Sequence, residues 1–406
     1  MSNDRPMFSI VMPTRNRAHL LRFALQSALN QTFDDYEVVV SDNFSSDDTR
    51  DVVRQLGSDR VRYFRTDRVL PMHESWDFAL NQALGERVMF LCDDDALLPY
   101  AIERIADCFS KHDLGVVAWL TGYYFLDTAC TAFSERRGQL ALPRGSRSII
   151  HIDSRSQLLA LFAMRSNFHL LPRFLNSCCS RRIVEKVRQD LGRVILPPCP
   201  DYTSCAAILA KTEGYAFIDS PLGIMGHGSH VFGVAPGPAA PTCHVQFVED
   251  YSGGMMKHVP LSFLTSENAI AESLLTVREA MPRELSWAQL DWVGYFAGCY
   301  TDLLSLMGMG LDISSLRREF RSVLSTYPVS VRARVWRRTV GARLKGICHR
   351  PRLWRAIVGS GLLRLLDASI RRRRRTVLGW KCTIPDILEA VRVACEFDTA
   401  GNPTSL

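Results

Sequence analysis

The sequence predicts an α/β fold with a mainly parallel sheet in its first part, followed by an α-helical C-terminal region. Apolar runs typical of buried strands alternate with apolar residues at helical spacing, and polar residues stand at the ends of successive strands. The apolar content of 47% and the charged content of 22% are ordinary for a folded protein. A chain of 406 residues is long enough for two domains, each with its own core.

The first hundred residues contain four predicted strands separated by helices. Because strands that alternate with helices form βαβ units, we expect these strands to run parallel. The strands are Phe8–Met12, Tyr36–Val40, Val61–Phe64 and Val88–Cys92, and the helices cover about residues 20–29, 49–56 and 74–84.

The middle of the chain continues with shorter elements and two predicted loops. Strands are expected at 115–120, 174–179 and 215–219, and helices at 158–164 and 206–210. Residues 127–152 are polar and predict a variable loop. Residues 223–230 contain three glycines and two histidines, and this composition predicts a flexible loop.

Polar residues follow the predicted strands where each of them ends. Thr14 and Arg15 follow the first strand, Asp42 the second, and Asp93–Asp95 the fourth. Ligands of open α/β sheets bind at the carboxyl ends of the strands, so these residues should converge. Three adjacent carboxylates repel one another, and a divalent cation with a phosphate on its far side gives a reason for them. The alternative is a solvated acidic turn that opens a helix at 97–99.

Several classes of protein are disfavoured by motifs that the sequence lacks. It contains neither the glycine-rich fingerprint of dinucleotide-binding enzymes nor the P-loop motif of nucleotidases. No apolar stretch of about 18 residues predicts a membrane-spanning helix, and the N-terminus lacks the apolar core of a secretory signal. The 12 cysteines form no regular framework. A reducing, cytoplasmic setting is therefore expected.

The motifs at Phe8–Asn16, Val38–Thr49 and Gly85–Pro99 together resemble those of family 2 glycosyltransferases with the GT-A fold. The resemblance is strong over about residues 7–110 and fades by about residue 230. It implies a Rossmann-like domain that binds a nucleotide-sugar, with Mn²⁺ or Mg²⁺ as cofactor. It places Pro13, Thr14 and Arg15 beside the nucleoside, Asp42 on the base, and Asp93–Asp95 as the metal-binding DXD motif.

Within the triplet, Asp95 is the expected metal ligand, whereas Asp93 and Asp94 stay open between metal, ribose and donor sugar. An ionised Asp42 accepts hydrogen bonds only, which suits the N–H groups of uracil or guanine. The resemblance favours uracil and therefore a UDP-sugar. The structural alternatives are a helix or turn cap for Asp42 and a surface arginine for Arg15.

Two later segments carry further candidate site residues. Asp201 opens the helix that continues through 206–210, and the resemblance implies that it is the general base of an inverting transfer. Its alternative is a helix N-cap. His227 or His230 in the predicted glycine-rich loop is a candidate ligand for the metal or the diphosphate, and the alternative is a solvated histidine.

The end of the chain is strongly basic. Residues 317–381 contain 19 Lys and Arg against two acidic residues, a net charge of +17, so the rest of the chain carries −10. We predict a catalytic domain over 1–233, a linker and helical region over 234–330, and a basic helical tail over 331–406. Arginines interleaved with Leu and Trp, ending in Arg371–Arg375, favour an anionic membrane surface over nucleic acid. A solvated basic face is the alternative.

The sequence as a whole predicts an inverting, metal-dependent glycosyltransferase that is cytoplasmic or peripheral on the inner face of the plasma membrane. The expected acceptor is a hydroxyl of a saccharide or lipid-linked glycan. A nucleotidyltransferase that acts on sugar phosphates is an alternative, although no glycine- and lysine-rich loop follows the first strand. A non-catalytic nucleic-acid-binding protein is a second alternative, and it leaves Asp42 and the triplet unexplained.

Overall fold

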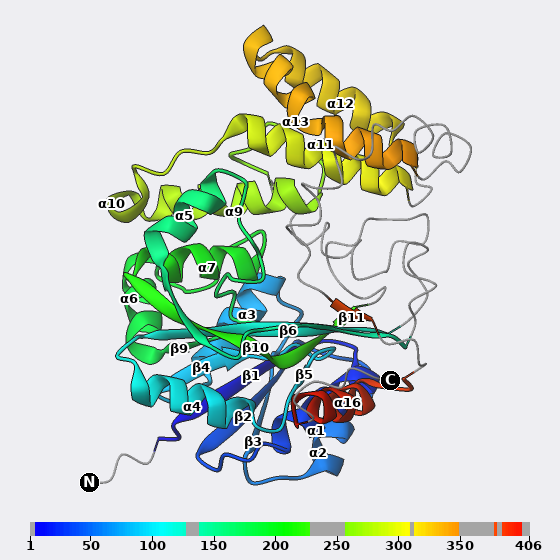
Figure 1. Cartoon of the computed structure of the whole chain (residues 1–406). Coiled ribbons are helices and arrows are strands. Elements are labelled where there is room, and N and C mark those ends of the chain that lie inside the picture. The colour runs from blue at the N-terminus through cyan, green and yellow to red at the C-terminus, as the bar shows by residue number, and fades with distance from the viewer. Residues whose placement is uncertain are drawn as a thin grey trace.

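The computed structural model describes residues 5–126, 138–227, 256–308, 312–348, 377–379 and 384–399. It shows an α/β domain on which helices from the later part of the chain form a further layer (Figure 1). The predicted α/β fold with a helical C-terminal region is confirmed. In chain order the elements are β1 (Phe8–Thr14), α1 (Ala18–Leu29), β2 (Tyr36–Asp42), α2 (Thr49–Leu56), β3 (Val61–Arg65), α3 (Met72–Asn81), β4 (Arg87–Phe90), β5 (Ala96–Leu97), α4 (Ala101–Lys111), β6 (Val116–Phe125), β7 (Leu140–Pro143), β8 (Ile149–Asp153), α5 (Ser154–Phe162), β9 (Ser177–Ser180), α6 (Arg181–Leu191), α7 (Pro200–Ala210), β10 (Gly214–His227), α9 (Ser266–Ala280), α10 (Pro282–Leu285), α11 (Trp292–Gly308), α12 (Ser314–Ser325), α13 (Val329–Cys348), β11 (Val377–Gly379) and α16 (Ile387–Thr399).

One mixed sheet of eleven strands runs through the α/β domain. Its main path is β11-β7-β6-β9-β4-β1-β2-β3, and β10 pairs with β6, β5 and β8. The strands β3, β2, β1 and β4 are parallel, as expected. Beyond β4 the sheet is mixed rather than mainly parallel, because β9 is antiparallel to both β4 and β6, and β7 is antiparallel to β6.

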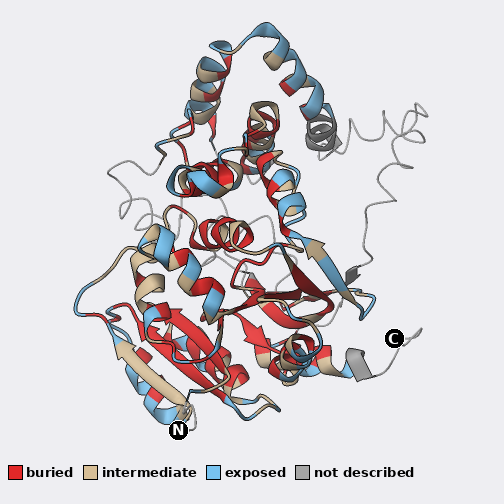
Figure 2. Ribbon diagram, turned by 90° about the vertical axis from the view of Figure 1, so that its left-hand side faces the viewer, coloured by how far each residue is buried: buried red, intermediate tan, exposed pale blue. Residues whose placement is uncertain are grey.

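The central strands are buried because helices cover both faces of the sheet (Figure 2). All seven residues of β1 and all seven of β2 are buried. One face packs against α1, α2 and α4, and the other against α3, α5, α6 and α7. Continuous apolar runs in these strands are therefore the expected pattern for a sheet with no solvent-facing side.

The glycine-rich segment predicted as a loop is partly a strand, so that prediction is wrong for residues 223–227. These residues form the second half of β10, and the strand pairs in parallel with β6 as far as His227 opposite Phe125. Glycine is needed at Gly226 because a Cβ there would collide with the carbonyl oxygen of Asp94. The glycines thus allow a close approach of two backbones rather than a flexible loop. Likewise, the predicted polar loop over 127–152 contains β7 and part of β8.

The later helices form a second core above the sheet. Aromatic side chains from α11 and α12 pack together there, with Phe296 in edge contact with Phe320 at a centroid distance of 5.9 Å. These aromatic side chains thus form a packed core. Among the helices of the described ranges, none has the length and apolar character needed to cross a bilayer.

The chain returns to the α/β domain through β11 and α16. β11 pairs with β7, and the Tyr124 hydroxyl donates a hydrogen bond of 2.7 Å to the carbonyl of Ile384. Ile387 and Ala390 of α16 are buried against Ala96 of β5. This part of the segment predicted as a basic tail therefore packs in the first domain. The division of the chain at residues 233 and 330 stays a prediction.

Candidate active site

The carboxyl ends of three parallel strands bring the predicted site residues together. The parallel register places Thr14, at the end of β1, opposite Asp42, at the end of β2. The pairing of β1 with β4 continues past the last paired residue, because the Leu91 N–H donates to the carbonyl of Val11 at 2.9 Å. The triplet that follows Cys92 therefore lies at the same sheet edge.

The side chain of Asp93 is bound to the loop after β1. Its Oδ2 accepts a hydrogen bond of 2.7 Å from the Thr14 hydroxyl, and its Oδ1 lies 3.0 Å from the guanidinium of Arg17. The same guanidinium lies 3.5 Å from Asp94 Oδ2. Arg17 thus compensates two of the three carboxylates, a role that the sequence did not assign to it.

Asp95 is held from the other side of the site by β10. Its Oδ1 accepts a hydrogen bond of 2.9 Å from the backbone N–H of Gly226. Only glycine fits against the Asp94 carbonyl at this position. The hydrogen bond from the Gly226 N–H to Asp95 therefore requires a glycine at residue 226. His227 directly follows Gly226, but the structure describes only its backbone, and His230 lies outside the described residues.

The three carboxylates are almost completely removed from solvent, with exposed fractions of 4%, 9% and 6% for Asp93, Asp94 and Asp95. Burial and the neighbouring Asp93 raise the pKa of Asp94 to about 6. Burial and Asp94 raise the pKa of Asp95 well above its usual range. The solvated acidic turn considered as an alternative is therefore not what the structure shows.

Asp94 and Asp95 form a cluster with Cys92 in which one ligand atom of each lies within 4.8 Å of the others. Oxygen ligands are preferred by Mg²⁺ and Mn²⁺. Burial raises the pKa of the Cys92 thiol well above its usual range, so the sulfur stays protonated and is a poor ligand for a hard cation. The residues present fit a divalent cation bound by Asp94 and Asp95, since a cation offsets charges that burial otherwise disfavours.

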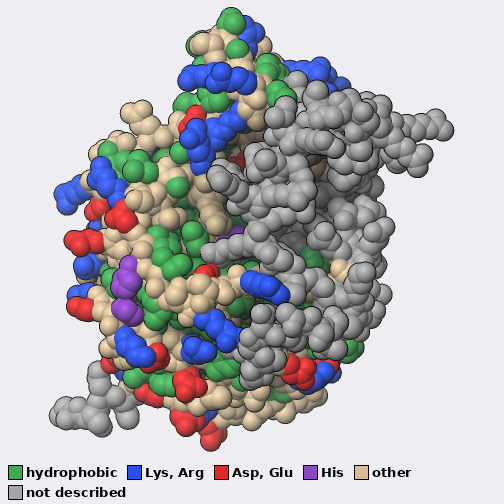
Figure 3. Space-filling view, in the orientation of Figure 1, with side chains coloured by type: hydrophobic (Ala, Val, Ile, Leu, Met, Phe, Trp, Pro, Cys, Tyr) green, Lys and Arg blue, Asp and Glu red, His purple; other side chains and the backbone are tan. Residues whose placement is uncertain are grey.

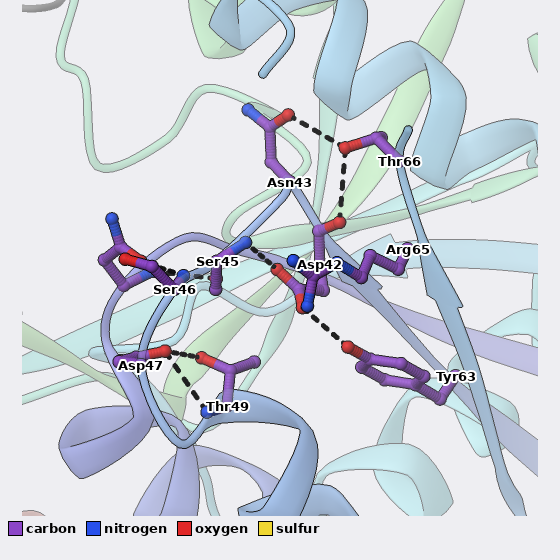
Figure 4. A network of polar contacts seen from close by, with 10 residues as sticks. Asp42, Asn43, Ser45, Ser46, Asp47, Thr49, Tyr63, Arg65 and Thr66 are labelled. Carbon is purple, nitrogen blue, oxygen red and sulfur yellow. Dashed lines mark hydrogen bonds and ion pairs between the residues drawn. The ribbon is translucent and has the colours of Figure 1, made fainter. Parts of the chain in front are cut away.

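Asp42 is fully buried, and both of its carboxylate oxygens have partners (Figure 4). Oδ1 accepts a hydrogen bond of 2.7 Å from the Ser45 N–H, and Oδ2 accepts one of 2.6 Å from the Tyr63 hydroxyl. Arg65 lies 3.7 Å from Oδ2. Burial and Asp42 raise the pKa of Tyr63 to about 12. The contact with Ser45 is the turn cap that was the structural alternative, although each oxygen retains a further lone pair.

The loops after β1 and β2 are bound to each other by side-chain caps. Asn16 Oδ1 accepts a hydrogen bond of 2.8 Å from the Ser46 N–H, and Asp47 accepts one of 2.9 Å from the Ala18 N–H at the start of α1. Asp47 also accepts from the N–H and hydroxyl of Thr49, which begins α2 (Figure 4). These bonds hold the loop that begins at Arg15, directly after Pro13 and Thr14 at the end of β1. Arg15 is half-buried and forms no ion pair with any residue in the described ranges.

Asp201 lies in the first turn of α7, and its side chain is 21% exposed. Its Oδ2 lies 3.4 Å from Nη1 of Arg173, a buried arginine before β9 that sequence reasoning did not single out. Burial raises the pKa of Asp201, and Arg173 opposes that rise. Arg173 also opposes the rise in the pKa of Asp95. The same cation therefore acts on the carboxylates of both Asp95 and Asp201. An arginine in an apolar segment after a proline is a weak signal in the sequence alone.

An α/β sheet with buried carboxylates at its strand ends defines a protein that binds a polar or phosphorylated ligand there. Residues 9–158 match the model of the family described as "Glycosyl transferase family 2". Over this range the chain is thus similar to family 2 glycosyltransferases, in line with the resemblance that its motifs indicate. The matched range includes Thr14, Asp42 and the triplet, and it ends before Arg173 and Asp201.

Curated relatives match about a quarter of the chain. A GalNAc(5)-diNAcBac-PP-undecaprenol beta-1,3-glucosyltransferase from Campylobacter jejuni is 43% identical over 103 residues, which are 25% of this chain and 33% of that protein. A UDP-Glc:alpha-D-GlcNAc-diphosphoundecaprenol beta-1,3-glucosyltransferase from Escherichia coli is 28% identical over 111 residues, 27% of this chain and 44% of that protein. The chain spans less than half the length of these relatives. The structure of S. aureus TarS residues 1–349 with UDP-GlcNAc aligns with a TM-score of 0.44 and 16% identity, covering 82% of this chain and 89% of that one.

We predict that Asp94→Asn raises Tm at pH 7 by a few degrees but leaves it unchanged at pH 4. Because the pKa of Asp94 is raised to about 6 in the folded state, ionisation costs the folded state more than the unfolded one. That loss of stability develops as pH rises from about 4 to above 6, and a neutral side chain avoids it.

Thermal unfolding of the metal-free protein at both pH values measures this difference. The control is Asp107→Asn, which changes a half-exposed carboxylate of α4 and should leave Tm unchanged at both values. Equal Tm values for Asp94→Asn and the unsubstituted protein at pH 7 would contradict the prediction.

Proposed function

We propose that this protein is an inverting glycosyltransferase that moves a sugar from a nucleotide-sugar, with UDP as the nucleotide, to an acceptor hydroxyl. The observation that supports it best is the convergence of Thr14, Asp42 and the buried aspartates at one sheet edge inside the range that matches the family 2 model. A non-catalytic nucleic-acid-binding protein gives no reason for this combination. A nucleotidyltransferase is disfavoured because no glycine- and lysine-rich loop follows the first strand.

On the donor side, we assign the nucleoside to the loop after β1 and to Asp42. The end of β1 carries Pro13 and Thr14 beside the end of β2. Arg15 follows them, and within the described ranges it has no ion pair that a phosphate must displace. Asp42 is buried, so the remaining lone pairs of its carboxylate are directional acceptors for base N–H groups.

We assign a divalent cation, Mn²⁺ or Mg²⁺, to Asp95 together with Asp94, and His227 remains a candidate further ligand. When bound, such a cation supplies positive charge that neutralises the diphosphate leaving group. Asp93 is the third member of the predicted metal motif. Its two oxygens are engaged by Thr14 and Arg17, which favours an anchoring role for it.

On the acceptor side, Asp201 is the proposed general base. The carboxylate takes the proton of the acceptor hydroxyl while the oxygen attacks the anomeric carbon. The bond to the nucleoside diphosphate then breaks on the opposite face, and the configuration inverts. A pKa raised by burial suits this role, because a base is most effective when its pKa approaches the working pH.

The acceptor is proposed to be a saccharide or lipid-linked glycan in cell-surface glycan biosynthesis. The relatives from Campylobacter jejuni and Escherichia coli are named for transfer to undecaprenyl-diphosphate-linked sugars, and the second is named for UDP-Glc. UDP-glucose with an undecaprenyl-diphosphate-linked acetamido sugar is therefore the first donor and acceptor pair to assay.

We predict that Asp95→Ala abolishes the metal-dependent part of UDP binding. Removing the carboxylate takes away the proposed ligand and leaves Asp94 alone beside the cation. Calorimetric titration of UDP with and without Mn²⁺ measures the effect, with Asp107→Ala as the control at an exposed position. The metal assignment is wrong if Asp95→Ala binds UDP in Mn²⁺ as tightly as the unsubstituted protein does.

We predict that Asp201→Asn leaves UDP binding unchanged and lowers the transfer rate by about 10²- to 10⁴-fold, the usual contribution of a general base. Asn is nearly isosteric but accepts no proton at neutral pH. Single-turnover transfer from UDP-glucose measures the rate. Asp190→Asn, on the outer surface of α6, is the control and should retain full activity. Near-normal turnover of Asp201→Asn would exclude it as the base.

We further propose that the protein binds the inner face of the plasma membrane as a peripheral protein. Blue side chains gather over α12 and α13 at the top of Figure 3. Residues 312–340, which include α12 and the first part of α13, contain seven arginines and two acidic residues, Asp312 and Glu319. Arg371–Arg375 lie outside the described residues. Each Lys or Arg near an anionic surface contributes about 1 kcal/mol to binding.

We predict that the protein sediments with vesicles containing phosphatidylglycerol and that changing Arg371–Arg375 to Gln weakens this binding at least tenfold. Neutral phosphatidylcholine vesicles are the control and should bind neither form. A protein that stays in the supernatant with anionic vesicles before and after the change would contradict the proposal. Binding to nucleic acid instead would support the competing interpretation of the basic segment.

A further inference from the structure

Arg173 is a cation in a place where arginine is uncommon. It lies between α5 and β9, and only 7% of it is exposed. Arginine is seldom buried unless partners compensate its charge. Its apolar neighbours Leu171 and Phe174 are fully buried.

The backbone around Arg173 is bound to the centre of the sheet. The Phe90 N–H, at the end of β4, donates to the carbonyl of Phe174 at 3.3 Å. The side-chain amide of Asn176 donates to the carbonyls of Trp119 in β6, at 3.3 Å, and Leu171, at 3.0 Å. The segment is therefore fixed between the strand that leads to the aspartate triplet and the strand that pairs with β10.

Among the described residues, the guanidinium of Arg173 has a carboxylate partner, and its buried Nε has no hydrogen-bond acceptor. Nη1 lies 3.4 Å from Asp201 Oδ2, and the guanidinium carbon lies 5.8 Å from the ring centroids of both Phe168 and Tyr202. The guanidinium thus lies within cation–π distance of two aromatic rings and beside Asp201.

We propose that Arg173 is a positioning residue for the transfer reaction, which keeps the Asp201 carboxylate ionised and oriented so that it can accept the acceptor's proton. The inference rests on the proposed function, because it assigns a partner to the proposed base. Arg173 itself transfers no proton, since an arginine side chain stays protonated in proteins.

The electrostatics around Asp201 agree with this role. Arg173 is the cation that opposes the rise in the pKa of Asp201, and Asp201 in turn contributes to the raised pKa of Tyr202, Cys199 and Cys205. Burial raises the pKa of Tyr202, Cys199 and Cys205, so these three groups are neutral at pH 7. Burial also raises the pKa of Asp201, and loss of Arg173 removes the cation that opposes this rise.

The test compares Arg173→Gln, Arg173→Lys and Arg165→Gln with the unsubstituted protein. The pH profile of kcat is measured at saturating donor. For Arg173→Gln we expect kcat at pH 7 to fall at least tenfold, the donor KM to stay within about twofold, and the acid limb to move to higher pH. Arg173→Lys keeps the charge and should keep the acid limb, with a smaller loss in kcat. Arg165 is exposed in the same connection and should be silent.

A purely structural role for Arg173 would lower the amount of folded enzyme without moving the acid limb. An acid limb of Arg173→Gln that coincides with that of the unsubstituted protein therefore overturns the inference. If Arg173→Gln does not fold, the Arg173→Lys variant decides the question, because it keeps the positive charge. An acid limb of Arg173→Lys that moves to higher pH would overturn the inference, and so would an unchanged kcat.

Thermal unfolding tests the same contact without any activity. Without Arg173, ionised Asp201 is less favourable in the folded state, so Arg173→Gln should lower Tm more at pH 8 than at pH 5. Adding Asp201→Asn should remove that pH dependence, and additive effects in the double variant would contradict the inference. If the unsubstituted protein transfers no sugar, the proposed function is wrong, whereas the Tm comparison still decides whether Arg173 holds Asp201.

Discussion

The structure of the site depends on how three adjacent buried carboxylates are compensated. Asp93, Asp94 and Asp95 follow β4 directly, and their mutual repulsion in a site with little solvent is unfavourable without opposite charge or hydrogen-bond donors. The protein supplies these from separate parts of the chain: Arg17 and Thr14 from the loop after β1, and the Gly226 N–H from β10.

The compensation is incomplete on the side of Asp94 and Asp95, where the pKa values remain raised. A fixed cation such as Arg17 cannot leave with the product, whereas a divalent ion can bind and release together with a diphosphate. Negative charge on Asp94 and Asp95 that the protein does not fully compensate is thus consistent with the proposed site for a metal ion and a phosphorylated ligand. Asp201 lies in a different setting, with one arginine beside it and partial exposure, which suits the general base that we propose.

The later part of the chain has two separate structural roles. Helices α9, α11, α12 and α13 form their own aromatic core above the sheet. By contrast, α16 returns to the sheet and covers Ala96 of β5, the strand that begins directly after Asp95. The segment after the triplet is therefore held by residues almost 300 positions away in the chain.

Features that depend on residues close together in the chain could be predicted from the sequence. The apolar runs of β1, β2 and β4 identified buried parallel strands, and the polar residues that end them identified Thr14, Asp42 and the triplet as one site, because parallel strands end at one edge. Only the tertiary structure decided the partners: Arg17 beside the triplet, Gly226 in a strand rather than a loop, Arg173 beside Asp201, and α16 on β5. These contacts join segments far apart in the chain, so no local periodicity or spacing in the sequence encodes them.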